Sequence, residues 1–357
     1  MSRTLIIADL HLGSIARTSV LEREMPLQRL LNELERTDRL VLLGDSVELM
    51  EGRARAALSK AQPILRAFGA ALGAGAQVVL VPGNHERPMI RSWLRRQGPG
   101  LPVDARVPAD ASPELRAVVE QLSPAHVEVR YPGVYLSDAV WATHGHYLDG
   151  HLIPVSNWGR LRAAGEAPAS VTPWHYERPR RMPVSPVMRW LPEPPRRVNL
   201  SPAVRWLPEP VAARLRELRA LIRSSTMPAI GDNVFDPRIA PLTARLLSRQ
   251  MRHHALPALA RVVHQLDVQA EWVVFGHVHR LGPLPGDRPE EWRDAEGRIG
   301  FLNTGSWLYE PRLVNRVTPP HPYWPGGAVL LQDGLSPRAV GLLDDVPGDQ
   351  LQDPAAL

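Results

Sequence analysis

The sequence predicts an α/β fold in which parallel strands alternate with helices. Three apolar runs, at 5–8, 39–43 and 77–81, have the length of buried strands. The stretches 26–36 and 53–72, which separate them, carry apolar residues at helical spacing. Strand, helix, strand in this repeating order is typical of a sheet whose strands run parallel, with helices packed on it.

The later elements follow the same reasoning. A helix is expected at 113–122, and strands are expected at 127–131, 134–136 and 139–143. One or two helices are predicted over 239–265, with a kink or break at Pro257. Further strands are predicted at 271–275, 301–307 and 327–331. The tail 344–357 is acidic and poor in large apolar residues, so we expect it to be disordered.

Composition narrows the class of protein. With 357 residues and 44% hydrophobic residues, the chain can bury a large core. It contains no cysteine, which excludes disulfides, a thiolate nucleophile and cysteine-ligated zinc. Asp9 interrupts the first apolar run early, and no stretch reaches the length of a membrane span. We therefore expect a soluble, cytoplasmic protein without a transmembrane segment.

The region 147–235 differs from its surroundings. It is rich in proline, arginine and tryptophan, and it lacks strand patterns. Between Arg160 and Arg223 there are thirteen arginines and five glutamates, a formal charge of +8, whereas the whole chain carries +5. The segment 180–194 recurs at 196–210 with an offset of 16 residues. These features predict a partly helical, basic cap with a tandem duplication, inserted between two parts of one domain, 1–146 and 236–343.

Polar side chains follow five of the predicted strands. In parallel sheets the carboxyl ends of the strands border one crevice, so these side chains are expected to converge. Carboxylates, imidazoles and one amide oxygen together suit a pair of divalent metal ions such as Mn, Fe or Zn. The residues concerned are Asp9, His11, Asp45, Asn84, His85, His144, His277 and His279.

The order of these residues resembles the calcineurin-like metallophosphoesterase family, whose motifs are D-x-H, G-D-x-x-[DE], G-N-H-[DE], H-G and G-H-x-H. All five occur here in that order, at 9–11, 44–48, 83–86, 144–145 and 276–279. The resemblance covers roughly 1–146 and 236–343, and it does not cover the basic cap. It implies a four-layer α/β/β/α sandwich and a dinuclear metal centre.

The resemblance also implies roles for the residues. One metal would be held by Asp9, His11 and His279, and the other by Asn84, His144 and His277. Asp45 would bridge the two metals. A pair of metals can lower the pKa of a shared water, which gives a hydroxide that attacks phosphorus.

Two further residues would assist the reaction. His85 would protonate the leaving oxygen, because imidazole titrates in the required range. Glu48 stands where the family has an acid that orients this histidine, although a solvated turn residue is the alternative reading. His146, Arg87 and Arg280 flank the motifs and are candidate substrate-binding residues. An ordinary surface or supporting role remains open for each of these three.

The predicted activity is hydrolysis of a phosphomonoester, phosphodiester or pyrophosphate, with a phosphatase-like, nucleotide or sugar-nucleotide activity as the first choice. A nuclease is the alternative within the same chemistry. The alternative from another class is a catalytically silent, metal-bound scaffold that binds anionic partners. The cap could bind a substrate with several phosphates, nucleic acid or an anionic membrane surface, or serve as a structural lid or oligomer contact. The oligomeric state stays open.

Overall fold

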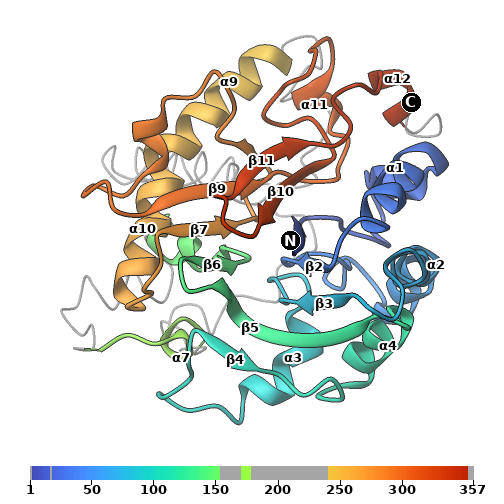
Figure 1. The fold of residues 1–357 in the computed structure, drawn as a ribbon, viewed down its shortest axis with the longest axis vertical. Helices are drawn as coiled ribbons and strands as arrows, with labels where there is room; N and C mark the ends of the chain where they lie inside the picture. Colours follow the sequence, from blue (N-terminus) through green and yellow to red (C-terminus); the bar gives the residue numbers. More distant parts are fainter. Residues whose placement is uncertain (1, 17, 153–169, 178–239, 353–357) are drawn as a thin grey trace, which may run out of the picture.

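The computed structural model describes residues 2–16, 18–152, 170–177 and 240–352. Its strands form one hydrogen-bonded path in the order β11-β10-β1-β2-β3-β5-β6-β7-β9-β8, with β4 beside β5. This path divides into two half-sheets that share the long strand β5. Figure 1 shows the first half with α1, α2 and α4 along its side, and the second half with α10.

The first half-sheet begins with three parallel strands, β1 (Arg3–Ile7), β2 (Arg39–Leu42) and β3 (Gln77–Leu80). Leu5 pairs with Leu40, which in turn pairs with Val78. The order of elements confirms the parallel arrangement predicted from the sequence. On the other side of β1, β10 (Gly327–Gln332) and β11 (Arg338–Gly341) add antiparallel strands from the end of the chain.

One strand, β5 (His126–Ser137), belongs to both half-sheets. Its first part pairs in parallel with β3, and its second part pairs antiparallel with β6 (Val140–Thr143). We expected two strands here, at 127–131 and 134–136, and this was wrong. Pro132 and Gly133 suggested a break, but Pro132 lies where the strand passes from one half-sheet to the other, next to β4 (Asp104–Arg106).

The second half-sheet continues in parallel from β6 through β7 (Trp272–Phe275) to β9 (Gly300–Thr304), and β8 (Leu281–Gly282) closes its edge. Three apolar clusters separate the layers. Helices α1 (Glu24–Leu34), α2 (Ala54–Leu72), α3 (Arg87–Leu94) and α4 (Pro113–Gln121) pack through one cluster against the first half-sheet. Helix α10 (Leu256–Gln265) packs through another against the second half-sheet.

The third apolar cluster lies between the half-sheets. It combines Ile6 and Val41 of the first half with Ala142 and Val274 of the second, and all four are completely buried. The neighbours Leu5 and Ile7 of β1 belong instead to the helix-facing cluster, because successive side chains of a strand point to opposite faces. The strands are therefore buried on both faces, which accounts for their uninterrupted apolar runs. The layers are α/β/β/α, as the sequence resemblance implied.

The segment before Pro257 is helical throughout. Helix α9 (Ala240–Gln250) passes into a π-helical turn (Met251–Ala255), and α10 begins at Leu256. Pro257 has no N–H for the carbonyl one turn earlier, so a change of helical pitch at this point has a local cause. Helix α9 packs on the short helix α11 (Pro311–Val314).

Part of the predicted disordered tail is ordered. Val346 and Leu351 are buried, and Gly348–Leu351 forms α12. Two apolar residues are enough to anchor this segment on the core, although its average composition is polar. Residues 353–357 lie outside the described part of the chain.

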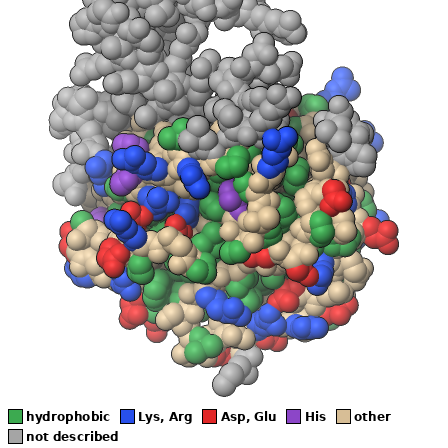
Figure 2. Space-filling view, turned by 90° about the horizontal axis from the view of Figure 1, so that it is seen from above, with side chains coloured by type: hydrophobic (Ala, Val, Ile, Leu, Met, Phe, Trp, Pro, Cys, Tyr) green, Lys and Arg blue, Asp and Glu red, His purple; other side chains and the backbone are tan. Residues whose placement is uncertain are grey.

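The region 147–235 is described only in short pieces. These are a 3-10 turn (His146–Leu148), α5 (Asp149–Leu152) and α7 (Pro173–Glu177). The duplicated segment and the predicted helix at 211–223 lie outside the described residues. On the face shown in Figure 2, basic and acidic side chains of the described part occur together. Among the described helices, none has the length and apolar character needed to cross a membrane.

Candidate metal centre

The loops after β1, β2, β3, β6 and β7 bring the predicted ligands together at one edge of the sandwich. The loops after β1 and β2 extend the parallel pairing beyond the strands, since the His11 N–H donates to the Asp45 carbonyl at 2.8 Å. Two groups of ligand atoms result, with the atoms of each group within 4.8 Å of one another. One group contains Asp9, His11 and His279, and the other contains Asp45, His144 and His277.

The backbone at these loops has an unusual conformation. Seven described residues other than glycine have a positive φ, and five of them are predicted ligands. L-residues enter this left-handed region at a cost, although Asp and His do so more readily than most residues. Strained backbone of this kind is held by its surroundings and clusters at functional sites. The five are Asp9 (56°), His11 (43°), Asp45 (51°), His277 (70°) and His279 (55°).

Backbone N–H groups hold the two carboxylates in place. The Asp9 side chain is completely buried, and its Oδ2 accepts the N–H of His277 at 2.9 Å. Its Oδ1 lies 3.2 Å from His279 Nε2. The Asp45 Oδ1 accepts the N–H of His85 at 3.0 Å. Each carboxylate is therefore held by a backbone N–H of another motif, and its second oxygen faces histidine nitrogens.

The second group is ordered around His144, which is completely buried. Its Nδ1 lies 3.0 Å from the Leu43 carbonyl, which can only accept, so Nδ1 carries the proton. Its Nε2 is then the basic nitrogen, and it lies 3.1 Å from Asn84 Oδ1 and 3.2 Å from Asp45 Oδ2. This arrangement is typical of a metal-binding histidine, whose other nitrogen is held by a carbonyl or carboxylate.

The electrostatics of Asp45 agree with a central position. Burial alone would raise the pKa of its carboxyl, but His144 and His11 outweigh burial and hold the pKa well below its usual value. In return, Asp45 raises the pKa of His144 to about 10 against the opposing effect of burial.

The donor set fits two divalent ions. Carboxylate, imidazole and amide oxygen are the ligands expected for Mn, Fe or Zn. Within the described residues, His11 Nε2 is buried without a hydrogen-bond partner, and Asp9 Oδ1 has only the 3.2 Å contact with His279 Nε2, which does not meet hydrogen-bond geometry. His11 Nε2 lies 3.8 Å from Asp45 Oδ2, too far for a hydrogen bond. Buried polar atoms left unsatisfied are costly, and a shared cation would complete them.

Glu48 and His85 form a contact pair at the rim of the centre. Glu48 Oε2 lies 2.5 Å from His85 Nδ1 and 2.9 Å from His11 Nδ1. Burial lowers the pKa of His85, but the Glu48 contact outweighs it and raises the pKa to about 9. Glu48 is buried, which excludes the solvated turn residue considered above.

Two supporting residues were not assigned a role from the sequence. Glu86 is completely buried, and its carboxylate accepts the N–H groups of Ser46, Val47 and Gly83 at 2.9–3.1 Å. Burial, with Asp45 nearby, raises its pKa to about 7. Asn303, also buried, donates from Nδ2 to the Gly276 carbonyl at 2.7 Å. Glu86 is the last residue of the 83–86 motif, so the sequence could have drawn attention to it. No sequence pattern around Asn303 indicates that it contacts Gly276.

The candidate substrate residues differ in their surroundings. Arg87 Nη2 lies 2.8 Å from the Glu177 carboxylate of α7, and the arginine side chain is 43% exposed. His146 Nε2 lies 3.2 Å from the Tyr131 hydroxyl, which also contacts Glu177. The rings of His146 and His144 are 5.5 Å apart. Arg87 and His146 therefore both lie near Glu177 of the cap, and His146 also lies beside His144 of the second ligand group. The sequence did not indicate this position of Glu177.

Arg280 has a different environment from the one we predicted. It is 2% exposed, its guanidinium makes a two-pronged ion pair with Asp287 at 2.5 and 2.9 Å, and it lies over the Trp292 ring. A buried arginine that is already paired in this way holds the 280–292 segment together. The structure therefore gives Arg280 a supporting role and not that of a phosphate clamp.

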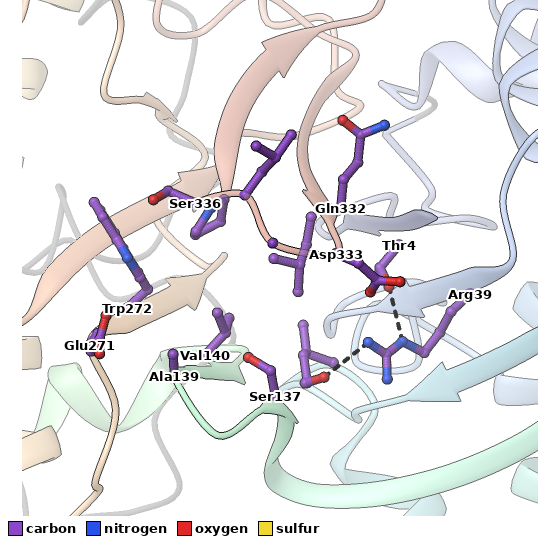
Figure 3. Close-up of a pocket in the computed structure, with 15 residues that line it drawn as sticks. Thr4, Arg39, Ser137, Ala139, Val140, Glu271, Trp272, Gln332, Asp333 and Ser336 are labelled. Carbon is purple, nitrogen blue, oxygen red and sulfur yellow. Dashed lines mark hydrogen bonds between the residues drawn. The ribbon is translucent and has the colours of Figure 1, made fainter. Parts of the chain in front are cut away.

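A cavity of about 370 Å³ lies at the opposite edge of the sandwich, where the parallel strands begin (Figure 3). Arg39 donates there to the Thr4 hydroxyl and the Leu136 carbonyl, both at 3.0 Å. None of the predicted metal ligands lines it. Because strand carboxyl ends carry the ligand loops, the metal centre and this cavity are separated by the length of the strands.

Comparison with known proteins now identifies the family. The search among curated proteins found no match. Among solved structures, a dimetal phosphatase from Danio rerio aligns over 96% of this chain and 99% of its own, with 14% identity and a TM-score of 0.35, a likeness too low to support an argument. The model of the calcineurin-like phosphoesterase family matches residues 2–281, which is most of the chain. The protein therefore belongs to the calcineurin-like phosphoesterase family and is a metal-dependent phosphoester hydrolase that uses two divalent ions.

Proposed function

We propose that this protein hydrolyses a phosphate ester at the centre formed by the two ligand groups. Asp9, His11 and His279 would hold one metal ion, and Asn84, His144 and His277 would hold the other. Asp45 would be shared by both. The observation that supports this is the position of Asp45 Oδ2, which lies 3.2 Å from His144 Nε2 in one group and 3.8 Å from His11 Nε2 in the other.

Two metal ions held by these residues would supply an activated water as nucleophile and would neutralise charge on the phosphoryl oxygens. The protein supplies the remaining parts of the chemistry. Glu48 holds His85 through Nδ1 and keeps the ring protonated, which leaves Nε2 to donate a proton to the leaving oxygen. His85 is 28% exposed, so a substrate can reach it from solvent. A protein that only binds partners would not need this pair, which argues against the silent scaffold.

The position of the cap bears on the substrate. His146 lies beside His144 of the second ligand group, and Glu177 of the cap lies between His146 and Arg87, with contacts of 3.8 and 2.8 Å. A substrate with a second charged or polar group, such as a nucleotide or sugar nucleotide, could reach these residues beyond the reacting phosphate. This supports nucleotides or sugar nucleotides as the first choice, with monoesters, diesters and pyrophosphates all within the chemistry, and a nuclease as the alternative.

The first test removes the shared ligand. Asp45→Ala should abolish Mn²⁺-dependent hydrolysis across a panel of aryl monoester, aryl diester, nucleotide, sugar nucleotide and single-stranded DNA. Its melting temperature with chelator, measured beside wild type, shows whether the variant is folded. Turnover close to that of wild type would contradict the proposed centre. The substrate with the highest kcat/KM in wild type decides between phosphatase and nuclease.

The second test separates the acid from the ligands. His85→Ala should still bind two metal ions per chain by isothermal titration calorimetry, while kcat falls by roughly 10²–10⁴-fold, the usual contribution of general acid catalysis. The loss should be smaller for a substrate with a good leaving group, such as an aryl ester, because that group needs no proton. Loss of a metal ion from this variant would mean that His85 is a ligand.

A further inference from the structure

Asp149, the first residue of α5, contacts a predicted metal ligand that is distant from it in the sequence. Its Oδ2 lies 3.1 Å from Nε2 of His277, which follows β7 and is 128 residues away in the sequence. The His277 side chain is 9% exposed and that of Asp149 is 29% exposed. The contact is therefore sheltered from bulk water, so its energy is reduced less by solvent than that of a surface pair.

A carboxylate at this distance selects one form of the imidazole ring. A neutral imidazole carries one proton, and an ionised carboxylate can only accept, so Nε2 is the donor. The proton is then absent from Nδ1, which becomes the nitrogen with a lone pair available for a metal. His144 shows the opposite arrangement, because its Nδ1 is held by the Leu43 carbonyl and its Nε2 faces Asp45.

We propose that Asp149 is a positioning residue that holds His277 so that Nδ1 faces the second metal. This rests on the proposed function, in which His277 is a ligand of that metal. The carboxylate would fix the tautomer and the orientation of the ring, which is what outer carboxylates do for metal-binding histidines. The start of the cap would thus support the metal centre directly.

The loop that carries His277 explains why such support is needed. His277 has a φ of 70°, and the buried Asn303 holds the carbonyl of the preceding Gly276. The backbone of His277 is fixed by Asp9, but that bond does not set the rotation of the ring. Asp149 supplies a contact at the tip of the ring.

The experiment compares Asp149→Ala and Asp149→Asn with wild type in full-length protein. Asp138→Ala is the control, because Asp138 is an exposed carboxylate in the turn between β5 and β6. Mn²⁺ binding is followed by isothermal titration calorimetry, and the spin-coupled pair is followed by electron paramagnetic resonance. Asp149→Ala should weaken only the second Mn²⁺ by about 10–100-fold, with loss of the coupled signal. Asp149→Asn should recover part of the affinity, because its amide oxygen still accepts the N–H.

A second measurement tests the ring directly. In Zn²⁺-loaded, ¹⁵N-histidine-labelled wild type, the His277 ring should carry its proton on Nε2 and metal on Nδ1. A metal on Nε2, or an unchanged second Mn²⁺ affinity in Asp149→Ala, would overturn the proposal. Equal weakening of both ions would also overturn it, because it would show a general structural effect. If wild type itself binds fewer than two ions, the proposed function fails instead.

Discussion

At the scale of single residues, the centre depends on very close approach between loops. A Cβ on Gly83 would lie 2.3 Å from Asp45 Oδ1 and 2.8 Å from the Asp45 backbone nitrogen. A Cβ on Gly44 would lie 2.3 Å from His144 Nδ1, at a φ of +89°. The glycines of the motifs therefore provide space for the ligands, and both Gly44 and the ligands take up left-handed backbone.

Gly83→Ala should displace Asp45 and weaken binding of both metal ions. The expected size is at least tenfold in Mn²⁺ affinity with a matching fall in kcat/KM, since Asp45 is shared. Gly98→Ala is the control, because a Cβ there meets nothing within 4 Å and φ is not in the left-handed region. Calorimetry on both variants checks the expectation, and wild-type affinity in Gly83→Ala would show that the loop adjusts at little cost.

The sequence located the predicted ligands, which the structure brings close together, much better than the residues that contact them. The predicted ligands stand in short motifs directly after apolar runs, so a local pattern locates them. Asn303 and Asp149 act on loops that are distant in the sequence, and their partners depend on which strands are neighbours in the second half-sheet. For Arg280 the local pattern was misleading. Its place next to a motif suggested a phosphate contact, but its guanidinium pairs with Asp287, seven residues later.

At the scale of elements, the loop between α11 and β10 covers the end of β8. The Pro322 carbonyl accepts the Leu281 N–H at 2.7 Å, and the side chain of the next residue, Tyr323, is buried. His321 accepts the Tyr323 N–H at its Nδ1, at 3.3 Å. That bond requires an unprotonated Nδ1. Burial, together with the Arg280 charge, lowers the pKa of His321 to about 4.

This loop should make the protein less stable in mild acid. Between pH 6.5 and about 4, the unfolded chain binds a proton at His321 that the folded chain does not, so the free energy of unfolding falls as pH falls. After allowance for partial exposure, the loss is about 1–2 kcal/mol. His321→Asn keeps an acceptor without the titration. Urea unfolding of chelated protein at pH 7 and pH 4.5 should show a smaller loss for the variant, and equal losses would contradict the assignment.

Elements were predictable where the pattern was local. The runs 5–8, 39–43 and 77–81 gave β1, β2 and β3 because each is buried on both faces. The continuity of β5 through Pro132 was not predictable, since it depends on β4 and β6 as partners on different sides. The buried tail residues Val346 and Leu351 likewise depend on a core that composition alone does not reveal.

At the scale of the whole molecule, the metal centre lies where the half-sheets meet. Asp9, Asp45 and Asn84 follow strands of the first half, whereas His144, His277 and His279 follow strands of the second. The inner apolar cluster joins the same two halves. Metal ions at this place would hold both halves together, so we expect metal binding to increase the stability of the folded protein.

Removal of metal should therefore lower the melting temperature. A ligand that binds only the folded state adds about 2.7 kcal/mol per site when its free concentration is 100 times Kd. Calorimetric scans with Mn²⁺ and with chelator should differ by several degrees in wild type. The difference should shrink in Asp45→Ala, which serves as the control for non-specific effects of the chelator. Equal melting temperatures in wild type would show that the ions do not stabilise the fold.

The pairing of β1 with β10 has a consequence for biosynthesis. Arg3 lies opposite Gln332, so one edge of the first strand stays unpaired until nearly the whole chain has been made. At typical synthesis rates of 5–20 residues per second, that interval is roughly 15–65 s. An apolar edge left open on the ribosome can pair with another nascent chain. His277 and His279 also emerge late, so a metal that reaches the early motifs meets an incomplete set of ligands.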